Sequence, residues 1–285
     1  MDRRRFLQLS ALATAASAGA GTVGYTLGVE PHWLEITTRD LPVANLPAAL
    51  DGARLAHLSD LHIGPQVDDA YLIASFDRLR ALAPDIVAIT GDFVSHRPER
   101  GESQFVQLRE VLSHLPRGRL ATVGILGNHD YGVSWRQPEV AARVVSEAER
   151  AGVRMLRNET QSVAGLDIIG VDDLWARRGD PARALHARTS DAALVLVHNP
   201  DAADQQRWPG YTGWMLAGHT HGGQCKAPFL PPPLLPVQNK DYVSGAIPVS
   251  GDPARALYIS RGVGHLIKAR FNVRPEIAVL TLRRG

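Results

Sequence analysis

Cysteine is almost absent from this chain of 285 residues, since Cys225 is the only one. A single thiol cannot form an intramolecular disulfide, so the fold must rely on its core, and 45% apolar residues can build one. An excess of charge is missing too: residues 1–20 hold three of the 31 basic and one of the 29 acidic residues, which leaves 28 of each. A general nucleic-acid-binding surface is not indicated, and we expect no nucleic-acid partner.

The N-terminus carries an arginine cluster followed by a long uncharged run. Arg3, Arg4 and Arg5 precede Phe6-Leu7, and no charged residue occurs from there to Val29. This pattern is typical of a twin-arginine export leader, which predicts the export machinery as a partner and a location in the periplasm or on the outer face of the cytoplasmic membrane. Small residues at 16–20 offer cleavage sites, but the run is also long enough to span about 30 Å of hydrocarbon. Residues 1–29 are therefore expected to be a leader or a membrane anchor; an ordinary N-terminal helix is the alternative.

The rest of the chain is predicted to be an extended connection over residues 30–52, rich in proline and turn residues, and one domain over 53–285. Short apolar runs of the domain predict buried strands at Arg54–Leu58, Asp85–Thr90, Leu120–Leu126, Leu166–Val171, Ala193–Val197 and Trp214–Ala217. Amphipathic stretches between them predict helices at Asp69–Leu82, Glu102–Leu115 and Pro138–Ala151. This alternation indicates an α/β fold. Strand-like pieces without helices at 153–171, Ala256–Ser260 and Glu276–Leu282 suggest a second sheet with hairpin connections.

Polar residues with metal-binding side chains directly follow five of these apolar runs. They are Asp60 and His62, Asp92, Asn128 with His129 and Asp130, His198, and His219 with His221. Loops at the carboxyl ends of neighbouring strands meet in one crevice of an α/β sheet, so we expect these side chains to converge.

Carboxylates, imidazoles and an amide oxygen form a mixed oxygen and nitrogen ligand set, which suits two divalent ions such as Mn, Fe or Zn. Asp60 and His62 are two residues apart, so on an extended segment they point to the same side, and His219 and His221 repeat this spacing. The alternative for any one of these residues is a cap, a turn residue or a core histidine.

The blocks Asp60-x-His62, Gly91-Asp92, Gly127-Asn128-His129-Asp130, His198 and Gly218-His219-x-His221 are similar, in order and content, to the calcineurin-like metallophosphoesterase superfamily. The sequence around these blocks resembles the bacterial exported branch of this superfamily, which includes hydrolases of UDP-diacylglucosamine-type lipid precursors. The resemblance implies a two-sheet sandwich flanked by helices. It also implies a first ion held by Asp60, His62 and His221, a second held by Asn128, His198 and His219, and Asp92 as the bridge between them.

The same resemblance implies catalytic roles for His129 and Asp130. His129 would face the substrate, stabilise phosphoryl charge and donate a proton to the leaving oxygen, and Asp130 would fix its tautomer. Two ions about 3.5–4 Å apart lower the pKa of a bridging water, and the resulting hydroxide would attack the phosphorus.

These features predict a two-metal phosphoester hydrolase of the cell envelope. An apolar segment, Phe229–Val237, follows His221 closely, and its prolines exclude a regular helix. With the possible anchor, it favours a phosphodiesterase that acts on a lipid-linked or other amphiphilic phosphate at a membrane surface. The alternatives left open are a soluble phosphomonoesterase or protein phosphatase, and a metal-binding envelope protein without activity. A proton donor beside an intact ligand set favours an enzyme.

Overall fold

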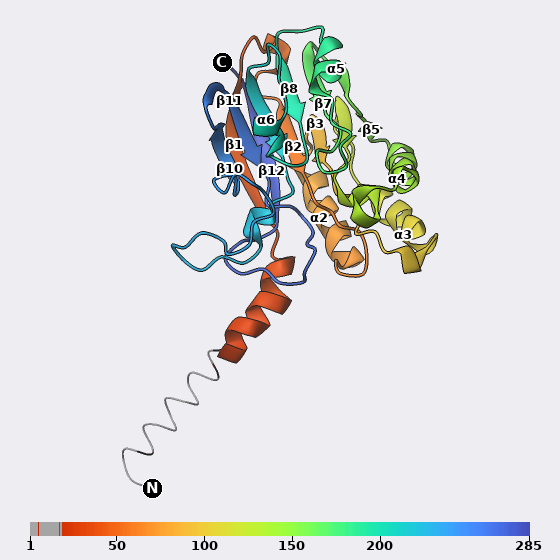
Figure 1. The fold of residues 1–285 in the computed structure, drawn as a ribbon, viewed down its shortest axis with the longest axis vertical. Helices are drawn as coiled ribbons and strands as arrows, with labels where there is room; N and C mark the ends of the chain where they lie inside the picture. The colour runs from red at the N-terminus through yellow and green to blue at the C-terminus, as the bar shows by residue number, and fades with distance from the viewer. Residues whose placement is uncertain (1–4, 6–16, 18) are drawn as a thin grey trace.

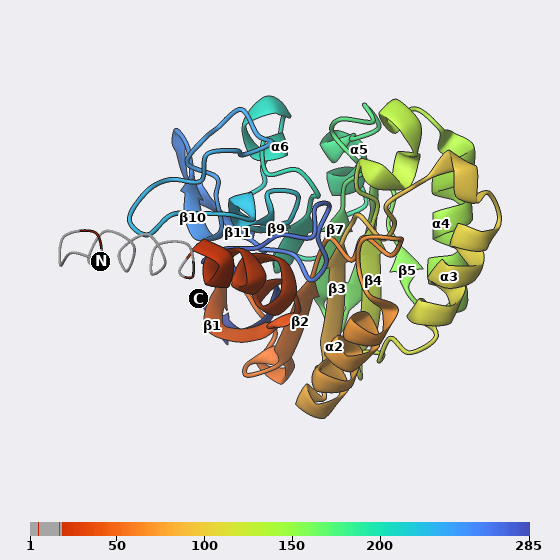
Figure 2. The same ribbon diagram turned by 90° about the horizontal axis from the view of Figure 1, so that it is seen from below.

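Two mixed β-sheets lie face to face in the computed structural model, which describes residues 5, 17 and 19–285. Each sheet has six strands within these residues, and helices cover the outer sides (Figure 1; Figure 2). The predicted α/β sandwich of two sheets flanked by helices is therefore confirmed.

The first sheet contains most of the strands predicted from the N-terminal half. Its order is β1 (Glu35–Val43), β12 (Glu276–Arg284), β2 (Arg54–Leu58), β3 (Ile86–Thr90), β4 (Ala121–Ile125) and β5 (Arg154–Met155). Strand β12 is parallel to β1 and antiparallel to β2, and β2 to β5 are parallel. Parallel neighbours need crossover connections, and these are α2 (Asp69–Leu82), α3 (Ser103–Leu112) and α4 (Pro138–Arg150).

The second sheet has a parallel centre and antiparallel edges. Its order is β10 (Gly245–Val249), β11 (Asp252–Ile259), β9 (Gly213–Ala217), β8 (Ala193–Leu196), β7 (Leu166–Gly170) and β6 (Glu159–Val163). Two short helices, α5 (Pro181–His186) and α6 (Ala202–Gln205), contribute buried alanines to the core on its outer face.

The apolar runs are continuous because the central strands are buried on both faces. In β3, Ile86 and Ala88 point into the core between the sheets, whereas Val87 and Ile89 point into the core beneath the helices. Successive side chains of such a strand point to opposite faces, and both faces contact an apolar core. A polar residue at any position of these strands is therefore buried.

Two expectations about the organisation of the chain are wrong, one on the connection at 30–52 and one on the sheet that contains Glu276–Leu282. The predicted connection at 30–52 includes β1, which pairs along its full length with β12 at the edge of the first sheet. An edge strand is half-exposed and tolerates proline, here Pro42, so its composition imitates that of a linker. Glu276–Leu282 was expected in the second sheet, but β12 lies in the first, between β1 and β2.

A helical segment at 19–32 precedes β1 and projects from the lower end of the molecule in Figure 1. At its base Glu30 is buried, and its carboxylate accepts the backbone N–H groups of Asn272 and Val273. No helix within the described part of the chain is long and apolar enough to cross a membrane. Arg3, Arg4 and half of the uncharged run of the predicted leader lie outside the described residues.

Candidate metal centre

The predicted ligands converge where the carboxyl ends of both sheets meet. Asp60 and His62 follow β2 and Asp92 follows β3 in the first sheet, whereas His198 follows β8 and His219 and His221 follow β9 in the second. These six residues are buried and form two groups, Asp60 with His62 and His221, and Asp92 with His198 and His219. Within each group the donor atoms lie within 4.8 Å of one another, which is close enough for one ion to contact all three.

Asp92 lies between the two groups. Its Oδ2 is 3.2 Å from Nε2 of His198 and 3.6 Å from Nε2 of His62, which belongs to the other group. The other carboxylate oxygen, Oδ1, accepts the backbone N–H of His129 at 2.9 Å. The carboxylate is therefore held on one side and free to bridge two ions on the other.

Three of the imidazoles are oriented through one ring nitrogen, which leaves the other nitrogen for a metal. Nδ1 of His198 donates to the carbonyl of Thr90 at 2.7 Å, and Nδ1 of His62 is 3.2 Å from Oγ of Ser95. His219 is turned the opposite way: its Nε2 donates to the carbonyl of Pro236 at 2.9 Å, so Nδ1 faces His198.

Unpaired buried oxygens test whether a cation fits this site. Asp60 Oδ2 accepts the backbone N–H of His219, but Oδ1 is buried and has no hydrogen-bond partner among the described residues. Both side-chain polar atoms of Asn128, which follows β4, are also buried and unpaired there. Buried polar atoms are seldom left without partners, and divalent ions would satisfy both oxygens. The donor set therefore fits two cations.

The backbone around the ligands is strained. Five residues of the site have φ between 48° and 70°, in the left-handed region that residues other than glycine rarely adopt: Asp60, His62, Asp92, His219 and His221. Strain of this kind, about 1–3 kcal/mol per residue, persists only where the surroundings hold it and is frequent at functional sites. Gly218 shows how tight the packing is, because a Cβ there would lie 1.8 Å from Oγ of Ser59 and 2.5 Å from Oδ2 of Asp60.

Electrostatics in the metal-free site follow from this crowding. Burial lowers the pKa of His219 to about 3, with the neighbouring charge of His198 acting in the same direction. For His198 burial acts the same way, but the carboxylates of Asp92 and Asp60 outweigh it and raise its pKa to about 10. The metal-free protein therefore holds a proton on His198 where an ion would bind.

His129 lies beside the metal ligands, with its ring centroid 5.2 Å from that of His62, and it lines the adjacent cavity. Burial lowers its pKa, so the neutral imidazole predominates at pH 7. A neutral ring still donates one N–H hydrogen bond. His129 thus lines the cavity beside the candidate ligands, where a neutral ring can donate a hydrogen bond to a phosphoryl oxygen, and its catalytic role stays a prediction.

Asp130 was predicted to fix the tautomer of His129, but its hydrogen bonds are to the backbone. Its two carboxylate oxygens accept the backbone N–H groups of Val94 and Gly127 at 3.1 and 2.9 Å. Asp130 therefore ties the loop after β4 to the loop after β3, and it positions Asp92 and Asn128 instead of fixing the tautomer of His129.

An apolar cavity of about 260 Å³ opens directly beside the metal ligands. Asp92, His129, His219 and His221 contribute to its lining, and the rest of the lining includes Trp175, Cys225, Pro233, Leu234, Pro236, Leu266, Ile267 and Ala269. The Phe229–Val237 segment thus lies next to the crevice, as its closeness to His221 in the sequence predicts. Trp175 and the Pro236 carbonyl were not predicted, because nothing near them in the sequence indicates their contact with His219.

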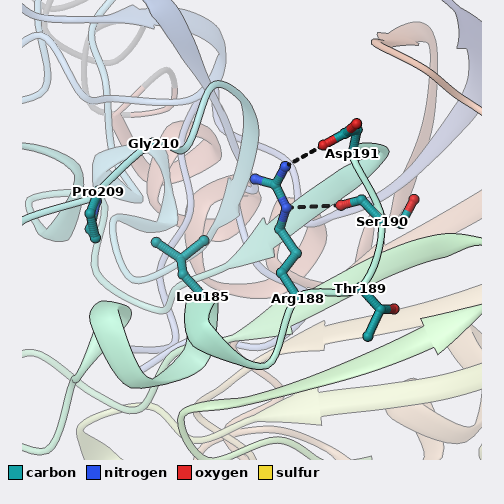
Figure 3. Close-up of a pocket in the computed structure, with 7 residues that line it drawn as sticks. All are labelled: Leu185, Arg188, Thr189, Ser190, Asp191, Pro209 and Gly210. Carbon is teal, nitrogen blue, oxygen red and sulfur yellow. Dashed lines mark hydrogen bonds and ion pairs between the residues drawn. The ribbon is translucent and has the colours of Figure 1, made fainter.

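A second, polar depression of about 480 Å³ lies at the end of the second sheet opposite to the metal centre (Figure 3). It is formed by segments that precede β8 and β9, so it opens at the amino ends of these strands, away from the metal ligands. Arg188 there is bound to the Ser190 carbonyl and to Asp191. The metal centre is therefore the site that concentrates reactive groups.

Two sheets that deliver carboxylate, imidazole and amide ligands to a two-ion centre define a metal-dependent hydrolase. The chain belongs to the calcineurin-like phosphoesterase family, whose pattern matches residues 53–223. It is accordingly a metallophosphoesterase.

Relatives match over almost the whole chain. The phosphodiesterase YaeI of Escherichia coli is 32% identical over 99% of this chain and 99% of its own length. The metallophosphoesterase YkuE of Bacillus subtilis is 32% identical over 99% and 98%. The UDP-2,3-diacylglucosamine pyrophosphatase LpxG of Chlamydia trachomatis is 25% identical over 95% and 96%.

Asp92→Asn and His129→Ala should both lower turnover but should differ in metal content. Asp92 lies between the two groups, so its loss should release at least one ion, whereas His129→Ala should keep both and lose about 10²–10³-fold in rate, the cost of removing one hydrogen-bond donor from the reacting phosphoryl group. Elemental analysis of the purified variants beside steady-state assays measures this difference. Equal metal loss in the two variants would remove His129 from the substrate side of the site.

Metal binding should release protons and strengthen as pH rises. A histidine ligand must be neutral, and the raised pKa of His198, about 10, means that binding below that pH expels its proton. Apparent affinity for Zn²⁺ or Mn²⁺ should rise up to about tenfold per pH unit for each proton released. Calorimetric titrations in buffers of different ionisation enthalpy count these protons, and an affinity independent of pH below 10 would contradict the charge state of His198.

Proposed function

We propose that this protein is a phosphodiesterase of the cell envelope that acts on a lipid-linked or other amphiphilic phosphate. The observation that carries the proposal is the apolar cavity whose wall contains the metal ligands themselves. A substrate with its phosphate at the metals would have an apolar portion against Leu234, Leu266 and Ile267, as an amphiphile requires. Relatives named as a phosphodiesterase and as a pyrophosphatase of a diacylated sugar nucleotide support the same class.

Within this proposal the chain holds two divalent ions and orients the substrate. Asp60, His62 and His221 would hold the first ion, Asn128, His198 and His219 would hold the second, and Asp92 would contact both. When bound, such ions activate a water molecule and neutralise phosphoryl charge. His129 donates a hydrogen bond to a phosphoryl oxygen, and the segment around Pro236 excludes bulk water from one side of the cavity while it fixes the ring of His219.

Exposed apolar side chains near the cavity suggest that the enzyme meets its substrate at a membrane surface. Phe229 is fully exposed, Leu234 is 77% exposed and Ile267 is 69% exposed, and Lys226 and Lys268 lie close to them in sequence. The helical segment at 19–32 leaves the same end of the molecule (Figure 1). Apolar side chains with basic neighbours are suited to the headgroup region of a bilayer that contains anionic lipid.

Export by the twin-arginine route completes the proposal, with residues 1–29 as leader or anchor and the remainder as the enzyme. The arginine pair and the uncharged run after it support this part. A soluble phosphomonoesterase or protein phosphatase would need neither the leader nor the exposed apolar segment.

Replacing Phe229, Leu230 and Leu234 with Ser should slow hydrolysis of a vesicle-borne phosphodiester at least about tenfold, because each buried apolar side chain contributes about 1.5–3 kcal/mol. Hydrolysis of a short water-soluble phosphodiester should stay within about twofold. The matched control is Val106→Ser with Leu120→Ser, which removes two exposed apolar side chains remote from the cavity. If the loop variant slows hydrolysis of both substrates by the same factor, the segment has a structural role and the proposal of an amphiphilic substrate is wrong.

Arg3→Lys with Arg4→Lys should keep the protein in the cytoplasm, because a lysine pair does not replace the guanidinium pair of a twin-arginine leader. Cell fractionation with immunodetection measures the distribution. Arg5→Lys, which leaves the pair intact, is the control and should be exported normally. Unchanged export of the double variant would show that residues 1–29 have another role.

A further inference from the structure

Two tryptophans lie beside the metal centre. The ring centroids of Trp135 and Trp175 are 4.5 Å apart, with the planes tilted by 35°, and the centroids of Trp175 and His219 are 4.4 Å apart, with the rings nearly perpendicular. Trp175 lines the apolar cavity on one side, and on the other it lines a second cleft of about 660 Å³ together with Trp135. The metal cavity and the neighbouring cleft therefore share the side chain of Trp175.

The second cleft differs in chemistry from the apolar cavity. Besides the tryptophans it is lined by Ser134, Arg136, Ala176 and Arg177. Both arginines are exposed, and neither forms an ion pair with any residue that the structure describes. Free guanidinium groups at an open cleft attract anions and fit phosphate oxygens with paired hydrogen bonds.

The backbone of the cleft is strained where the tryptophan pair is mounted. Ser134, Trp135 and Arg177 have φ of 53°, 60° and 57°. This conformation is unfavourable for a residue as bulky as tryptophan, and it persists only where the surrounding structure imposes it. The fold therefore keeps the indole of Trp135 at the cleft against its local preference.

We infer that this cleft is the headgroup subsite of the enzyme and that it binds a nucleotide. A planar base stacks on the indole of Trp135, Arg136 and Arg177 attract the negative charge of the nucleotide, its reacting phosphate lies at the metal centre, and the apolar remainder of the substrate lies in the other cavity. Aromatic side chains bind bases through their π-faces, whereas an alkyl chain gains nothing from two charged arginines. The inference rests on the proposed function, because the reacting phosphate has to lie at the metals between the two cavities.

The test uses the full chain with Mn²⁺, methyl p-nitrophenyl phosphate as substrate, and thymidine 5′-monophosphate and ribose 5-phosphate as competing ligands. Trp135→Ala should raise the inhibition constant of the nucleotide at least about fivefold and leave that of ribose 5-phosphate within twofold. Trp135→Phe should restore most of the loss. Arg136→Ala with Arg177→Ala should weaken both ligands, and the control Arg39→Ala, an exposed arginine on β1, should weaken neither.

Failure of the subsite and failure of the proposed function give different results. If the wild-type protein does not hydrolyse the methyl ester, the proposed phosphodiesterase is wrong, and quenching of tryptophan fluorescence by the nucleotide still measures the subsite directly. If hydrolysis is normal but Trp135→Ala leaves nucleotide binding unchanged, or weakens ribose 5-phosphate equally, no base stacks on Trp135 and the inference is overturned.

Discussion

Two carboxylates and four imidazoles are buried together where two sheets meet, with donor atoms of each group of three close together, and the buried amide of Asn128 has no hydrogen-bond partner among the described residues. Such a set is electrostatically unsatisfied without cations, because burial removes the water that would otherwise solvate the carboxylates. The rest of the site follows from this constraint: the strained backbone of five ligand residues, the hydrogen bonds that tie the other ring nitrogens, and the absence of a side chain at Gly218.

The sequence was sufficient to predict the fold class and the six residues that the structure gathers into two candidate metal-binding groups, and the reason is local. Asp60, Asp92 and His198 each follow a strand that is buried on both faces, so the change from apolar to polar marks the strand end and the ligand at once. The apolar pattern did not show which of these strands belong to which sheet, since parallel strands of either sheet have the same pattern.

Features that depend on distant contacts were missed or misassigned. β1 looked like a connection because only its pairing with β12, more than 200 residues away, makes it a strand. Asp130 follows His129 directly, but its carboxylate turns to the backbone of Val94 and Gly127. Trp175 and Pro236 reach His219 from loops whose paths no local pattern determines.

The hydrogen bond from His219 to the Pro236 carbonyl joins a metal ligand to a loop with exposed apolar side chains. Anything that shifts this loop must also turn the imidazole, and the orientation of the ring sets how well it holds an ion. Under the proposed ligand assignment, the position of this loop and the occupancy of the second ion are thermodynamically linked, and such linkage is reciprocal. A surface that captures the loop in one position changes the affinity for that ion by the same factor by which the ion changes the affinity for the surface.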